Sequence, residues 1–154
     1  MFGCPKNRVL LEGSNRKTGV SFFRELGEYA YSQGTVIGME ANPTIYQTNY
    51  INETKEVFEL IEQVDSQGFR LNLDVGTMIY NKEAIGELKG NVEFINHVHI
   101  SEPWLKLIEK RKLHYNLAEL LRKEKYNGFI SIEMEKQELC DIEKCMMYIN
   151  EGFQ

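Results

Sequence analysis

The chain has 154 residues, of which 42% are hydrophobic, 27% charged and 11% aromatic. This length and balance predict one folded domain over residues 1–154 and exclude a disordered or collagen-like chain. No apolar run approaches the ~20 residues of a membrane-spanning helix, and no secretory leader is evident, so we expect a cytoplasmic protein without a membrane partner. The net charge of -5 disfavours a protein that grips phosphate backbones, and no nucleic-acid partner is expected.

In the first half of the chain, hydrophobic residues recur at helical spacing in segments that alternate with short apolar runs. The spacing predicts a helix over residues 20–31 and a strand over 35–40. A second helix is expected to have Thr54 as its cap. Its apolar stripe consists of Val57, Leu60, Ile61 and Val64.

The second half continues this alternation. Residues 69–74 alternate with a period of two, which predicts a strand, and a short helix is expected over about 83–88. The remaining predicted elements are a strand over 92–101, a helix over 113–125, a strand over 128–134 and a last helix with Leu139, Ile142, Cys145, Met146 and Ile149 on one face. Strands that alternate with helices predict an α/β fold of repeated βα units with a parallel sheet.

An ionisable residue lies at the end of each of four predicted strands: Glu40, Asp74, His99 and Glu133. Within each strand this residue is on the face opposite the apolar side chains that would pack under helices. The carboxyl ends of parallel strands meet at one edge, where α/β proteins bind ligands. Three carboxylates gathered there without a cation would raise one another's pKa, whereas with an imidazole they suit a divalent ion. The sequence therefore predicts a site for Mn²⁺, Co²⁺, Mg²⁺ or Zn²⁺.

For any one of these residues, the alternative is an ordinary strand-end charge or a core histidine. His97 lies deeper in its strand than His99, and the core interpretation is favoured for it.

Five segments then carry motifs in a fixed order: GCPKNR (3–8), IGMEANPTIY (37–46), NLDVGTM (72–78), INHVHISEP (95–103) and YNGFISIEM (126–134). Together they resemble the xylose isomerase-like TIM-barrel superfamily, which includes sugar isomerases, sugar epimerases and endonuclease IV-like proteins. The greatest likeness is to its sugar phosphate isomerase/epimerase members. Taken together the five segments indicate the fold, and they say much less about the substrate.

The resemblance implies a metal held by Glu40, Asp74, His99 and Glu133 from the last four strands of the barrel. It also implies that Glu40 and Glu133 are the catalytic acid/base groups, which move a proton at the carbon beside a carbonyl. Further residues in matching segments are expected to orient ligands or contact a sugar or sugar phosphate, or else to be surface or supporting residues: Lys6, Asn42, His97, Glu102 and His114.

The length differs from that of the family, because a complete (β/α)8 barrel needs about 250 residues. The chain is expected to form a partial, half TIM barrel of four to five parallel βα units that match strands 4–8, with residues 1–4 as the end of the fourth strand. Such a half leaves sheet edges and the inward side chains Val36, Ile95 and Phe129 uncovered. We therefore expect a homo-oligomer, most simply a homodimer, with a complementary half-barrel chain as the main alternative.

Three functions are compatible with the sequence. The first is a metal-dependent sugar isomerase or epimerase of carbohydrate metabolism, in a complete or truncated form. The second is an endonuclease IV-like phosphodiesterase, disfavoured by the presence of only three histidines and by the negative charge. The third is a non-catalytic half barrel that binds a metal or a partner.

Overall fold

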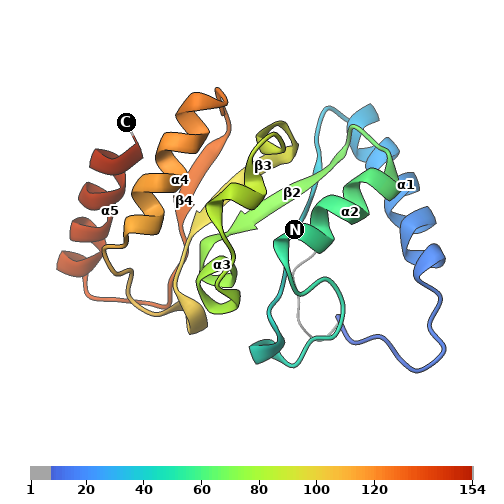
Figure 1. Cartoon of the computed structure of the whole chain (residues 1–154), viewed down its shortest axis with the longest axis horizontal. Coiled ribbons are helices and arrows are strands. Elements are labelled where there is room, and N and C mark those ends of the chain that lie inside the picture. The colour runs from blue at the N-terminus through green and yellow to red at the C-terminus, as the bar shows by residue number, and fades with distance from the viewer. Residues whose placement is uncertain (1–7, 154) are drawn as a thin grey trace.

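A computed structural model describes residues 8–153 of the chain. Within this range helices alternate with strands along the chain (Figure 1). The elements are α1 (Arg16–Ser32), β1 (Ile37–Met39), α2 (Thr54–Val64), β2 (Phe69–Asp74), α3 (Val75–Asn81), β3 (Ile95–Ile100), α4 (Lys112–Lys123), β4 (Phe129–Ile132) and α5 (Leu139–Phe153). Single turns of 3₁₀ helix lie between them: η2 (Thr44–Tyr46), η3 (Ile85–Leu88), η4 (Val92–Phe94) and η5 (Pro103–Leu105). No helix in this range has the length and apolar composition needed to span a membrane.

The four strands form one parallel sheet in chain order, β1-β2-β3-β4. The register pairs Asp74 with His99 and His99 with Ser131, so the strand ends lie at one edge of the sheet. Because parallel neighbours need a crossover, each connection contains a helix. This is the predicted α/β architecture of a partial barrel.

Alternating side chains of the strands form the core beneath the helices. Phe69, Leu71 and Leu73 of β2 are fully buried, as are Val98 and Ile100 of β3. The predicted stripe of α2 packs against this layer, and each of its members is at most 5% exposed: Val57, Leu60, Ile61 and Val64. Burying each such side chain contributes about 1.5–3 kcal/mol, which fixes the sheet in position.

Three local predictions were wrong in detail. The helix α2 is capped by Glu53 rather than by Thr54, because Glu56 accepts the Glu53 N–H at 3.1 Å in a capping box. The segment 83–88 forms only the 3₁₀ turn η3, and the helix before it, α3, was not predicted. In α5, Leu139 is 69% and Met146 59% exposed, so the buried face consists of Cys145, Tyr148 and Ile149 instead.

The inward face of the sheet is partly uncovered. Phe129 is 79% exposed and Val36 is half-buried, whereas Ile95 is buried. Among the described residues β4 pairs only with β3, and beside it a groove of about 570 Å³ lies between β4 and α5. The prediction of an uncovered face is thus confirmed at Phe129 and wrong at Ile95.

Candidate metal centre

Three of the predicted ligands meet at the ends of their strands. Glu40 directly follows β1, His99 lies near the end of β3, and Glu133 directly follows β4. Each offers a ligand atom, and these atoms all lie within 4.8 Å of one another. The Nδ1 atom of His99 is 2.9 Å from a carboxylate oxygen of Glu133 and 3.5 Å from one of Glu40. We call these residues the triad.

The carboxylates of Glu40 and Glu133 stabilise the protonated, positively charged form of the His99 imidazole. Hydrogen bonds to Glu133 and Glu40 raise the pKa of His99 to about 10, despite partial burial of the ring. The same contact with His99 lowers the pKa of Glu133. Since the carboxylates stabilise a proton on His99 at neutral pH, the triad is a preformed position for a cation.

Neighbouring groups fix the orientation of Glu40. The Nδ2 atom of Asn72 donates a hydrogen bond to its carboxylate at 2.7 Å. The buried guanidinium of Arg8 donates to the backbone carbonyl of Glu40 at 2.5 Å and to that of Tyr50 at 3.3 Å. Sequence reasoning named neither residue as functional, although Asn72 is on the same predicted face of β2 as Asp74.

Asp74 lies beside the triad with its carboxylate already engaged. It caps α3 by accepting the Thr77 N–H at 2.6 Å, and its other oxygen accepts the hydroxyl hydrogen of Ser101. Ser101 in turn accepts the Gly76 N–H at 2.8 Å. Burial, and then the charge of Glu40, raises the pKa of Asp74 to about 6. The structure therefore brings three of the four predicted ligands together and places Asp74 within their electrostatic reach.

Two of the predicted substrate residues lie near the triad in the chain. The His97 ring packs edge-on against that of His99 with centroids 4.9 Å apart, and its Nε2 atom is 2.7 Å from the Ser131 hydroxyl. Asn42 follows Glu40 by two positions and is buried. Its Nδ2 atom has no hydrogen-bond partner among the described residues.

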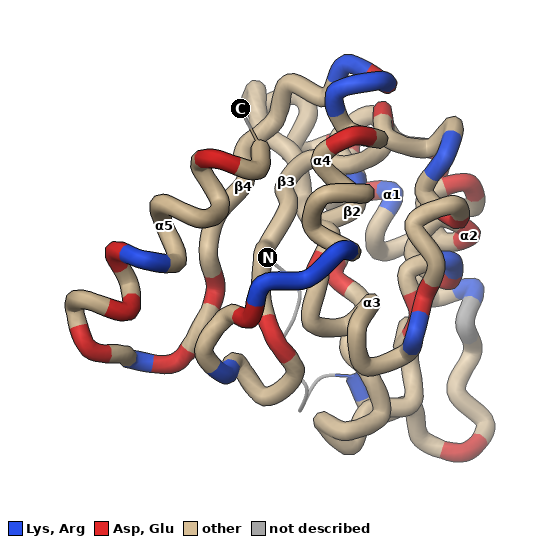
Figure 2. Tube along the Cα trace, turned by 60° about the vertical axis from the view of Figure 1, so that its left-hand side comes forward, with Lys and Arg blue, Asp and Glu red and all other residues tan. Residues whose placement is uncertain are grey.

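The other predicted substrate residues are engaged elsewhere or not described. Glu102 is buried and accepts two hydrogen bonds from Arg111, at 2.6 and 2.7 Å. Arg111 belongs to the basic stretch that leads into α4 (Figure 2). His114 is buried with its Nδ1 atom 3.1 Å from the hydroxyl of Tyr148. Lys6 lies outside the described residues.

The donor set fits a divalent ion. One imidazole nitrogen with carboxylate oxygens suits Mn²⁺, Co²⁺ or Zn²⁺, and carboxylate-rich sites also suit Mg²⁺. Asn72 supplies the supporting hydrogen bond to a ligand carboxylate that metal sites commonly have. The partly exposed Glu133 leaves the triad open on one side, where a small molecule could reach it.

A parallel sheet whose strands alternate with helices, with acidic and imidazole groups at its carboxyl edge, is the arrangement of a partial βα barrel. The model of one family, described as "Xylose isomerase-like TIM barrel", matches residues 5–149. The chain belongs to this family. No curated protein matches the sequence.

Several solved structures are similar in fold. D-psicose 3-epimerase from Clostridium cellulolyticum H10, solved with D-tagatose, superposes with a TM-score of 0.77 at 15% identity, covering 96% of this chain and 61% of that one. 3-keto-D-glucoside 4-epimerase from E. coli superposes with a TM-score of 0.74 at 20% identity, covering 92% of this chain and 56% of that one. An AP endonuclease, family 2, from Brucella melitensis superposes with a TM-score of 0.71 at 20% identity, covering 85% of this chain and 54% of that one. The chain therefore spans less than two thirds of each of these proteins.

Proposed function

We propose that the chain binds a divalent metal ion through Glu40, His99 and Glu133, with Asp74 as a fourth ligand, and that it interconverts small sugars by moving a proton at a carbon beside a carbonyl. The observation that carries this proposal is the position of two carboxylates around one imidazole, at 2.9 and 3.5 Å. Similarity in fold to two sugar epimerases supports the substrate class.

In this proposal, the two glutamates have the catalytic roles. One carboxylate takes a proton from the substrate carbon, and the other returns a proton to the opposite face. A bound divalent ion would act as a Lewis acid toward the substrate carbonyl. Asn72 keeps the Glu40 carboxylate in one orientation by its 2.7 Å hydrogen bond, and His97 supports the His99 ring.

An endonuclease-like activity is the second family function. One structure similar in fold is an AP endonuclease. The triad contains a single histidine, however, and the net charge is -5. A phosphodiester substrate would have to approach a carboxylate-rich edge, so the sugar reaction is the better supported of the two.

The decisive experiment measures Mn²⁺ binding by calorimetry and proton exchange by NMR. Wild-type protein with Mn²⁺ is incubated in D₂O with D-tagatose or D-fructose, and deuterium entering beside the carbonyl is followed. Glu133→Gln should weaken Mn²⁺ binding by more than about 100-fold and abolish exchange. Glu119→Gln, on the exposed side of α4, is the matched control and should resemble wild type. Wild-type protein that binds no Mn²⁺ would refute the metal site. Mn²⁺ binding without proton exchange would refute the sugar reaction and favour a non-catalytic half barrel that binds a metal.

A further inference from the structure

The turn η5 connects the loops that follow the three ligand-bearing strands. It comes directly after β3, which carries His99. Its Trp104 N–H donates a hydrogen bond to the hydroxyl of Tyr46, in the loop after β1, at 3.1 Å. The carbonyl of its Leu105 accepts the N–H of Glu135, two residues beyond Glu133, at 2.7 Å. These hydrogen bonds join the turn to the segments that follow β1 and β4, and together the three segments form the rim of the triad at the carboxyl ends of the strands.

The backbone of this turn is strained where it carries its largest side chain. Trp104 has φ of 59° and Leu105 has φ of 52°, both in the left-handed region that bulky residues rarely occupy. Such conformations persist only where the surrounding contacts enforce them, and they gather at ligand sites. Here the two hydrogen bonds from neighbouring loops provide that enforcement.

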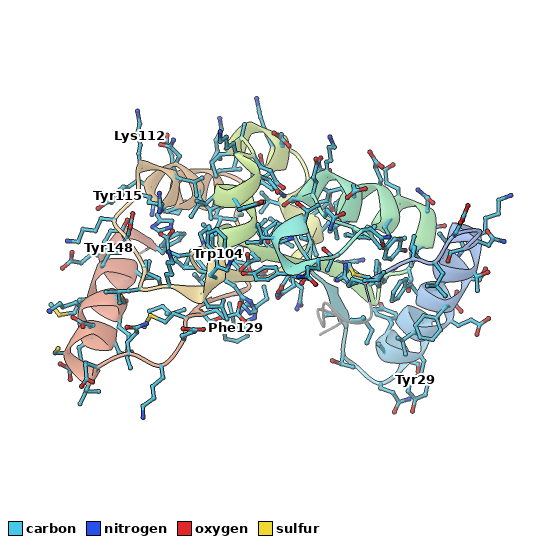
Figure 3. The ribbon with its side chains drawn as sticks, turned by 90° about the horizontal axis from the view of Figure 1, so that it is seen from below. Tyr29, Trp104, Lys112, Tyr115, Phe129 and Tyr148 are labelled. Atoms are coloured by element: carbon cyan, nitrogen blue, oxygen red, sulfur yellow. The ribbon has the colours of Figure 1, made fainter. Side chains whose placement is uncertain are left out.

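The indole of Trp104 is oriented but not covered. Tyr80 packs edge-on against it with ring centroids 6.1 Å apart, and the ammonium of Lys106 lies 5.4 Å from its centroid. The side chain nevertheless remains 52% exposed. In Figure 3, seen from below, Trp104 lies near the middle of the view, whereas Tyr29 lies at its edge. A fixed and half-exposed aromatic ring beside a polar site is typical of ligand pockets.

The charges at this rim restrict the ligand. The carboxylates of Glu40, Asp74 and Glu133 lie at the ends of their strands. Burial, and to a smaller extent the charges of these carboxylates, raises the pKa of the Tyr46 hydroxyl. Three carboxylates exceed the charge of one divalent ion, so a phosphate group at this rim would meet a net negative charge even with the metal bound. A neutral polyol has no such penalty and presents C–H groups to an aromatic face.

We infer that Trp104, on the strained turn η5, is a substrate-binding residue whose indole packs against the C–H face of an uncharged sugar while Tyr46 binds one of its hydroxyls. This inference rests on the proposed function and assigns its substrate class as a free sugar rather than a sugar phosphate.

Trp104 is the only tryptophan of the chain, so its fluorescence reports on this position alone. With Mn²⁺ bound, titration with D-fructose or D-tagatose should change the emission saturably and protect it from acrylamide quenching. Calorimetry should give the same dissociation constant. D-fructose 6-phosphate should bind no more tightly than D-fructose. Tighter binding of the phosphate would overturn the assignment of an uncharged substrate.

The variant Trp104→Gly removes the indole, and glycine accepts the left-handed backbone without strain, so the fold should be kept. We expect about tenfold weaker sugar binding by calorimetry, with Mn²⁺ affinity unchanged within twofold. Tyr29→Ala, which removes an exposed aromatic ring from α1, is the control and should bind sugar as wild type does.

Equal sugar binding by Trp104→Gly and wild type, or sugar binding that leaves the emission unchanged, would overturn the inference. The absence of sugar binding to metal-loaded wild type would overturn it as well. Failure to bind Mn²⁺ would instead refute the proposed metal site, so the two failures are distinguishable.

Discussion

The strongest electrostatic prediction concerns the proton on His99 in the metal-free protein. Hydrogen bonds with Glu133 and then Glu40 raise the pKa of His99 to about 10. Glu133→Gln removes the larger of these causes and leaves Glu40 at 3.5 Å from Nδ1. The pKa of His99 should therefore fall in the variant toward its ordinary value near 6.5.

This shift also sets a dependence of stability on pH. Because the pKa of His99 is higher in the folded than in the unfolded chain, its contribution is fully present below about pH 6.5 and is lost as the pH rises through about 10. A rise from 6.5 to about 10 corresponds to at most about 5 kcal/mol. Solvent at the partly exposed Glu133 reduces this to about 2 kcal/mol. The free energy of unfolding should fall by that amount between pH 6.5 and 10, and less in Glu133→Gln.

Proton NMR of the imidazole rings provides the assay, because the chain has only three histidines. Burial lowers the pKa of both His97 and His114, so only His99 should titrate at alkaline pH. If all three rings titrate below about pH 7.5 in the metal-free wild type, the account of the triad as a preformed cation position is wrong.

Two further predictions concern the scaffold of the site. Arg111→Met removes the two hydrogen bonds that Arg111 donates to the buried Glu102 carboxylate and leaves only the one from the Glu109 N–H. The free energy of unfolding should fall by about 2–3 kcal/mol in urea titrations, and Glu102→Gln in the same background should restore part of that loss. An unchanged urea midpoint in Arg111→Met would show that this pair does not hold the loop after β3. Gly68→Ala should lower the free energy of unfolding by at least about 3 kcal/mol, because the added Cβ would overlap the backbone carbonyl of Gly27. The control Gly86→Ala has open space around the added Cβ and should leave the free energy of unfolding unchanged. Equal thermal midpoints for the two glycine variants would contradict the close approach of α1 to β2.

The sequence was sufficient to predict the architecture because the relevant signals are periodic and local. Residues 69–74 alternate with a period of two, and the α2 stripe recurs at helical spacing, so both elements were predicted correctly. The helix α3 was not predicted because its seven residues are too few to show a helical period, and it begins directly after β2 with Asp74 as its cap. Its start coincides with a residue that had been interpreted only as a ligand.

The candidate site was predictable to the extent that alternation along a strand, which we call strand parity, decides which side chains share a face of the sheet. Parity brings Glu40, His99 and Glu133 together, and the structure agrees. It does not show what engages Asp74, since the bond from Ser101 depends on how the loop after β3 turns back. The hydrogen bonds from Arg111 to Glu102 could not be predicted either, because the two residues are nine positions apart across a loop without periodicity.

The triad comes from the ends of β1, β3 and β4, which belong to one sheet whose chain order equals its spatial order. Every candidate ligand is thus inherited as one contiguous stretch, from residue 40 to residue 133. In evolutionary terms, the loops that follow the strands can diverge in sequence while the strand ends keep the candidate ligands in place, so that one fold can acquire different ligand specificities.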